Sequence, residues 1–72
     1  MTMEITYTKH ARLRMAQRRI SEAEVRQAIK NADIQYTDPA GNDIFVAHVG
    51  NRRIKVVVAK GSKPPHVITT GD

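Results

Sequence analysis

The apolar residues between positions 20 and 32 recur every three or four residues, as they do on one face of an α-helix. The four positions that carry this period are Val25, Ala28, Ile29 and Ala32, spaced as i, i+3, i+4 and i+7. Ser21 and Glu24 stand just before them at the spacing of a capping box, in which the two side chains bond free backbone N–H groups of the first turn. The pattern predicts a helix over residues 21–31.

A second helix is predicted over residues 9–18, where Thr8 can serve as the N-cap. On a helical wheel its basic side chains form a stripe at i, i+4 and i+8, and this basic stripe consists of His10, Arg14 and Arg18. Ala11 and Met15 lie directly beside it. Because a cationic and an apolar stripe adjoin, we expect some of the basic groups to lie at the edge of the hydrophobic core.

After Ala32 the helical period gives way to short runs of alternating β-branched and aromatic residues. The predicted strands cover residues 34–37, 43–49, 52–60 and 66–70, with a further short strand at residues 5–7. Turn-forming residues separate these runs, and Gly50-Asn51 has the composition of a two-residue type II′ hairpin turn. The order of elements is therefore (β)ααββββ.

This order predicts an α+β fold in a single domain that spans residues 1–72. Consecutive strands joined by short turns favour an antiparallel sheet of three to four strands, with the two N-terminal helices packed on one face. Apolar and polar residues alternate in the strand at residues 52–60, so that Arg53 and Lys55 are expected on the face that points to water.

The chain has 72 residues, no cysteine and a formal net charge of +5, with a sequence pI of about 10.1. Such a charge favours an anionic partner, either nucleic acid or an acidic protein. A chain this short buries only a small core, which makes a second copy in a homodimer another candidate partner. No apolar run approaches the length of about 20 residues that crosses a bilayer, and the N-terminus does not resemble a signal peptide. We expect a cytoplasmic protein without membrane contact.

Metal-dependent chemistry is not expected from this sequence. Its three histidines have no cysteine to accompany them, and none forms a helical i, i+4 pair with another metal ligand. There is no Gly-rich phosphate loop, and Glu22 and Glu24 are explained by the start of a helix. The sequence therefore predicts neither a metal nor a cofactor.

The basic stripe contains residue types that could cleave RNA without a metal. Such cleavage needs a group that takes the proton of the 2′-hydroxyl, a group that protonates the leaving oxygen, and cations near the charged transition state. His10 can exchange a proton near neutral pH, while Arg14 and Arg18 can hold a phosphate. Further candidate contacts for RNA or another anion are Arg12, Arg53 and Lys55.

Two other interpretations are open. The same basic surface can bind RNA, the ribosome or an acidic protein without catalysis, which is favoured by the lack of a second proton-transfer residue near His10. In a purely structural homodimer, His10 and Arg14 would instead be buried and hydrogen-bonded within the fold.

The helical region also resembles a known family. From His10 to Ile29 the chain follows the pattern H-A-x-x-R-M-x-x-R-x-I-S-x-x-E-V-x-x-A-I, which is similar to the signature of the DUF4258 family of small bacterial proteins. The strands at residues 53–58 and 67–69 fall where that family has its sheet. Arg19 departs from the pattern, because the family commonly has glycine there, and a helix that ends at this position needs a left-handed backbone.

The layout of that family resembles the RelE/ParE and BrnT-like toxins, in which N-terminal helices pack on an antiparallel sheet. Many of those toxins are ribonucleases, acting on the ribosome or alone, that an antitoxin protein neutralises. The resemblance implies a toxin with His10, Arg14 and Arg18 as its active residues, assisted by Lys55 and Thr69 from the sheet. It also implies an acidic antitoxin as partner.

Overall fold

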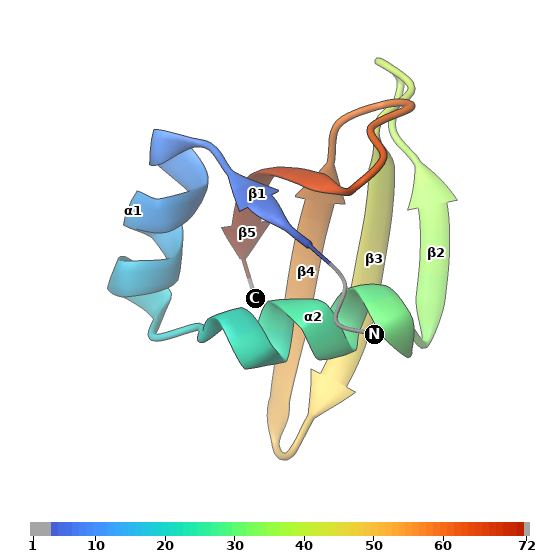
Figure 1. Ribbon diagram of the computed structural model, residues 1–72. Helices are drawn as coiled ribbons and strands as arrows, with labels where there is room; N and C mark the ends of the chain where they lie inside the picture. Colours follow the sequence, from blue (N-terminus) through green and yellow to red (C-terminus); the bar gives the residue numbers. More distant parts are fainter. Residues whose placement is uncertain (1–3, 72) are drawn as a thin grey trace.

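Both predicted helices are present in the computed structural model, which describes residues 4–71 (Figure 1). They are α1 (Lys9–Arg18) and α2 (Glu22–Lys30). Thr8 caps α1 as predicted, because its hydroxyl accepts a hydrogen bond of 3.0 Å from the N–H of Ala11. The capping box of α2 is also confirmed, with bonds of 2.9 and 3.1 Å between Ser21 and Glu24. Within the described part of the chain, no helix is long and apolar enough to cross a membrane.

Within residues 4–71, five strands form one mixed sheet. They are β1 (Thr6–Tyr7), β2 (Ile34–Thr37), β3 (Asp43–Val49), β4 (Arg52–Val58) and β5 (His66–Gly71). Their order in the sheet is β1-β5-β4-β3-β2, which confirms the α+β class and the predicted order of elements. Strands β2 to β5 are antiparallel neighbours, as expected. The sheet is larger than the predicted three to four antiparallel strands, because β1 is added parallel to β5.

Strand β1 joins the sheet beside the first residues of β5. Thr6 pairs with His66 and Tyr7 with Val67, and the N–H of Thr8 donates to the carbonyl of Val67 at 3.0 Å. A strand of two residues is too short to show an alternating pattern. Its parallel pairing with the last strand is therefore not visible in the local sequence.

The two helices take different positions on the sheet. Helix α2 crosses one face against β3 and β4, whereas α1 lies beside β5 at the edge (Figure 1). The core between helices and sheet contains Ala11, Met15, Ile20, Val25, Ala28, Ala47, Ile54, Val56, Val58 and Val67. Alternate residues of β4 face this core as predicted, which leaves Arg53 and Lys55 on the side away from α2. We call that side the open face.

Arg19 and Arg52 hold the C-terminal end of α1. Arg19 has the left-handed conformation, with φ 56° and ψ 47°, so an arginine makes the turn for which glycine is the usual residue. The guanidinium of Arg52 on β4 donates to the carbonyl oxygens of Arg18 and Arg19 at 2.5 and 2.7 Å. A cation at this end of a helix also interacts favourably with the negative pole of the helix dipole. These bonds fix the last turn of α1 against the sheet.

Candidate anion-binding site

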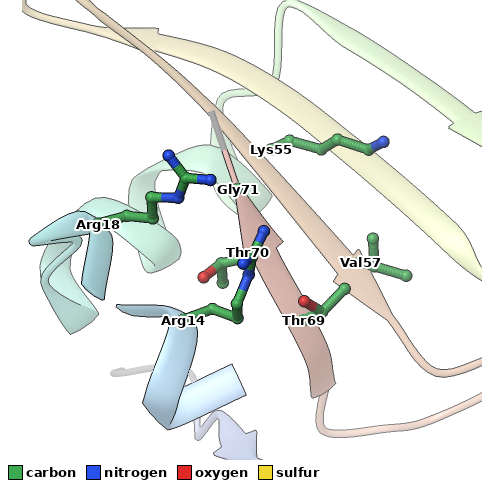
Figure 2. A pocket seen from close by; sticks show the side chains of 7 residues that line it. All are labelled: Arg14, Arg18, Lys55, Val57, Thr69, Thr70 and Gly71. Atoms are coloured by element: carbon green, nitrogen blue, oxygen red, sulfur yellow. The ribbon is translucent and has the colours of Figure 1, made fainter. Parts of the chain in front are cut away.

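A pocket of about 250 Å³ opens where α1 meets the edge of the open face. Figure 2 shows the residues that line it, which are Arg14, Arg18, Lys55, Val57, Thr69, Thr70 and Gly71. Three of these are cations, and none of the described lining residues is Asp, Glu or His. We call it the arginine–lysine pocket. Converging cations without a carboxylate are suited to binding an anion.

Helix α1 presents Arg14 and Arg18 from one face, because they are four residues apart. The adjacent Ala11 and Met15 are buried in the core, which fixes the rotation of the helix and directs both arginines toward β5 (Figure 2). Arg14 is half-buried, and its side chain forms no hydrogen bond or ion pair with any residue of the described chain. Its guanidinium donors are therefore available to a ligand.

A β-bulge in β5 determines which threonine faces the pocket. Val67 and Thr69 pair with consecutive residues of β4, so that Ile68 between them is an extra residue. Without it, strand alternation would point Thr69 to the same side as Val67, into the core. The extra residue reverses this alternation. Thr69 consequently lies on the open face, and Thr70 is buried.

Thr8 ties this bulge to α1. Its hydroxyl donates to the carbonyl of Ile68 at 2.7 Å while it accepts the capping bond from Ala11. The backbone N–H of Thr8 bonds the carbonyl of Val67. A single residue thus positions the helix that carries the arginines and the strand that carries Thr69.

Lys55 reaches the pocket from the open face of β4. It is half-buried and, like that of Arg14, its side chain has no hydrogen-bond or ion-pair partner among residues 4–71. In Figure 2 its ammonium group points away from the two arginines. A flexible four-carbon chain allows this charge to turn toward a ligand, whereas each guanidinium offers a rigid fork of donors. The two side-chain types can therefore hold one anion from different sides.

Thr70 lines the pocket as a residue, but its hydroxyl is buried. Thr70 is 3% exposed, and its Oγ1 has no hydrogen-bond partner among the described residues. Leaving a buried hydroxyl unpaired costs about 1–3 kcal/mol.

A family described as "Domain of unknown function (DUF4258)" matches residues 7–72 of this chain. The chain belongs to the DUF4258 family. The matched range contains both helices and every residue that lines the arginine–lysine pocket, so the pocket is part of the DUF4258 domain. Comparison with curated proteins and with solved structures gives no match. The likeness to RelE/ParE and BrnT-like toxins stays a prediction from the sequence.

The predicted site residues of this DUF4258 domain fall into two groups. Arg14, Arg18, Lys55 and Thr69 come together in the pocket, whereas His10, Arg12 and Arg53 do not line it. His10 is exposed in the first turn of α1, one turn before Arg14, and Arg53 is exposed on the open face, two residues before Lys55. Within residues 4–71, no three side chains of His, Cys, Asp or Glu are grouped so that they could hold a metal ion.

Arg12 has contacts away from the pocket. Its Nη1 donates to Glu22 at 2.7 Å, and its guanidinium lies 4.3 Å from the centre of the Tyr7 ring. Burial raises the pKa of the Tyr7 hydroxyl above its ordinary value of 10.0, and the charge of Glu22 raises it further, while Arg12 and Arg26 lower it. Arg12 therefore links α1 to α2 and β1.

Three pocket residues, Val57, Thr70 and Gly71, were not predicted as part of a site. The alternation of β4 already placed Val57 on the same face as Lys55, so that signal was present in the sequence. Thr70 and Gly71 depend on the bulge at Ile68, which arises from the pairing of β5 with β4. No local pattern in β5 indicates it.

Proposed function

We propose that this protein binds RNA through phosphate groups that occupy the arginine–lysine pocket. The observation that carries this proposal is the convergence of Arg14, Arg18 and Lys55 on one pocket that has no carboxylate among its described lining residues. A guanidinium can donate two parallel hydrogen bonds to a phosphate. The net charge of +5 adds long-range attraction for a polyanion.

The surroundings of the pocket favour a phosphate within a chain over a small free anion. The pocket lies at the edge of the open face, where the neighbouring groups of a polymer have room to continue. Arg53 on the open face and His10 on α1 are exposed beyond the pocket, and each can meet a neighbouring phosphate. RNA supplies such a series of charges.

The test is the affinity for an RNA that contains both paired and unpaired segments, measured by fluorescence anisotropy. Arg14→Gln and Lys55→Gln each remove one charge-assisted contact, so we expect each to weaken binding by about tenfold. Lys9→Gln is the matched control, because Lys9 is an exposed residue of α1 that does not line the pocket. An equal loss in all three variants would show that binding follows net charge and would contradict the proposal.

Cleavage of the bound RNA is a second candidate function, favoured by the position of His10 one turn before Arg14 on the basic stripe. In this reaction the 2′-oxygen attacks the adjacent phosphorus and displaces the 5′-oxygen, which leaves a 2′,3′-cyclic phosphate and a 5′-hydroxyl. His10 would accept the 2′-hydroxyl proton or donate one to the leaving oxygen. The arginines would stabilise the negative charge on the phosphorane-like transition state.

Incubation of RNA with the purified protein in EDTA tests this second function. Products with 2′,3′-cyclic phosphate ends from the wild type, and their loss in His10→Ala, would support it. Cleavage that persists in His10→Ala would exclude His10, and the absence of cleavage in both would leave binding alone.

A toxin role, as the resemblance implies, would make an acidic antitoxin a competitor for the same cations. A small acidic protein encoded beside this reading frame, whose co-expression relieves growth inhibition, would support that role. Growth that is unaffected by expression of this protein would contradict it.

A further inference from the structure

Two rows of side chains cross the open face from the arginine–lysine pocket to the edge strand β2. The strand register places Tyr36, Ile44, Val57 and Thr69 in one row and Ile34, Val46, Lys55 and Gly71 in the next. Both rows begin at residues that line the pocket and end on β2. The two rows therefore connect the pocket with the edge strand β2 across one face of the sheet.

The two ends of these rows differ in chemistry. The pocket end carries the cations, whereas at the β2 end Tyr36 and Ile34 are 44% and 54% exposed. Between them, Ile44 and Val46 are buried but do not belong to the core under the helices. They form an apolar layer on the open face, next to the exposed Tyr36 and Ile34 in the strand register.

The charges on this face favour an anionic ligand. Neither row contains Asp or Glu, and the next row along the strands pairs His48 with Arg53. Asp33, just before β2, accepts hydrogen bonds of 2.9 Å from both the N–H and the ring Nδ1 of His48. These bonds hold the pKa of Asp33 below its ordinary value. The face thus combines an exposed aromatic ring with cations. The nearby carboxylate of Asp33 is hydrogen-bonded to His48.

We propose that the open face binds single-stranded RNA, with phosphates in the arginine–lysine pocket and an unpaired base stacked on Tyr36. This inference rests on the proposed function and names the form of RNA that the site takes. Any base can stack on an aromatic ring, so such binding tolerates many sequences. Ile34, beside Tyr36 on β2, provides apolar contact for the edge of the base.

The size of the sheet agrees with a ligand of a few nucleotides. Neighbouring strands lie about 4.8 Å apart, so β2 is about 10 Å from β4 and about 14 Å from β5. An extended single strand can span this distance and place phosphates at one end and a base at the other. A duplex cannot use both ends, because its bases are stacked on one another inside the helix.

Strand β2 also offers an edge that could pair with β2 of a second copy. Charged residues and proline commonly protect an edge strand from pairing. None of the four residues of β2 is of these types. Pairing of this kind would not use the cations of the pocket, which lie at the other end of both rows. The charge of the face therefore favours RNA, and dimerisation is an outcome that the experiment separates.

The experiment compares three ligands: a short oligouridylate, a blunt RNA duplex of the same length, and inorganic polyphosphate. We expect the wild type to bind the single strand more tightly than the duplex. Tyr36→Ser and Tyr36→Leu remove the aromatic ring, and both should lose about 5- to 100-fold in affinity for oligouridylate. Neither should change the affinity for polyphosphate, which has no bases. Tyr36→Phe keeps the ring and Gln35→Ser alters the opposite face of β2, so both should bind as the wild type does.

Each other outcome has a defined meaning once circular dichroism has shown that the variants are folded. Equal binding of single strand and duplex, unaffected by Tyr36→Ser but weakened by Arg14→Gln, would overturn this inference and leave the phosphate site standing. Failure of the wild type to bind RNA or polyphosphate would overturn the proposed function itself. A wild-type dimer that Tyr36→Ser converts to a monomer in sedimentation equilibrium would assign the edge of β2 to protein pairing and overturn the inference.

Discussion

Arg19 ends helix α1 in the left-handed backbone conformation. A Cβ atom makes this conformation unfavourable by about 1–2 kcal/mol relative to glycine. The cost is balanced by bonds that need the turn, because the carbonyl of Arg19 accepts from Arg52 and the N–H of Ile20 donates to Met15. Arg19 therefore contributes to this turn through its backbone. Its side chain is exposed.

Substitution of Arg19 by glycine tests this explanation. Glycine removes the steric cost, although it also gives the unfolded chain more freedom. We therefore expect Arg19→Gly to raise the free energy of unfolding by about 0.5 kcal/mol in urea denaturation. Gln17→Gly, inside the same helix, should instead lower it by about 1 kcal/mol. A loss of stability in Arg19→Gly would show that the side chain of Arg19 has a structural role.

Asp38 organises the turn between β2 and β3 as an ionised carboxylate. Its Oδ1 accepts a hydrogen bond of 2.8 Å from the N–H of Asn42. This bond lowers the pKa of Asp38 below its ordinary value of 3.8, and the side-chain amide of Asn42 contributes in the same direction. Because the pKa is lower in the folded state, the carboxylate stabilises the fold above pH 3.8. That contribution is lost as the pH falls through the folded-state pKa.

The pH dependence of unfolding should follow from this bond. Asp38→Ala should be less stable than the wild type at neutral pH, and the difference should shrink as the pH is lowered below 3.8. Urea denaturation of both proteins at a series of pH values measures it. A difference that stays constant across the series would mean that the charge of Asp38 is not what stabilises the turn.

At the scale of elements, the site depends on how α1 and β5 are joined. Thr8 caps α1 and bonds the bulge residue Ile68, so helix and strand share one anchoring side chain. Arg52 holds the other end of α1. The basic stripe is therefore fixed at both ends of its helix, while the bulge directs Thr69 to the open face.

Thr8→Val removes the hydroxyl but keeps the shape of the side chain. It loses the N-cap bond and the bond to Ile68, so we expect the free energy of unfolding to fall by about 2 kcal/mol. Thr8→Ser retains the hydroxyl and should lose much less. Thermal or urea unfolding of the three proteins measures the difference, and equal stability of Thr8→Val and Thr8→Ser would contradict the role of the hydroxyl.

Local signals in the sequence were sufficient for most elements. The caps at Thr8 and Ser21 set the starts of both helices, and Gly50 has the positive φ of 64° that the first position of its hairpin turn requires. The parallel pairing of β1 and the bulge in β5 were not predictable in this way. The parallel pairing of β1 joins residues 60 positions apart, such as Thr6 and His66. The bulge arises from the register of β5 against β4, which no pattern within either strand indicates.

The candidate site was predictable only in part for the same reason. Helical spacing joined His10, Arg14 and Arg18, but β5 ends beside the second half of α1, so Arg14 and Arg18 line the pocket and His10 does not. The alternation of apolar and polar residues in β4 predicted that Lys55 lies on the open face. Thr69 was implied by family resemblance alone, and its orientation depends on the bulge.

At the scale of the whole molecule, the two faces of the sheet have separate roles. The face under α2 holds the hydrophobic core, which fixes the fold. The open face carries the arginine–lysine pocket at one edge and an exposed tyrosine at the other. A small domain can support both because the bulge and the capping residue allow one strand, β5, to contribute to core and pocket together.

The salt dependence of RNA affinity tests the central claim most directly. On single-stranded RNA, each phosphate contact contributes about 0.7 to the slope of log affinity against log salt concentration. We therefore expect the double variant Arg14→Gln/Lys55→Gln to reduce the magnitude of this slope by about 1.4, while Lys9→Gln leaves it unchanged. The same slope in the wild type and the double variant would mean that no phosphate occupies the arginine–lysine pocket.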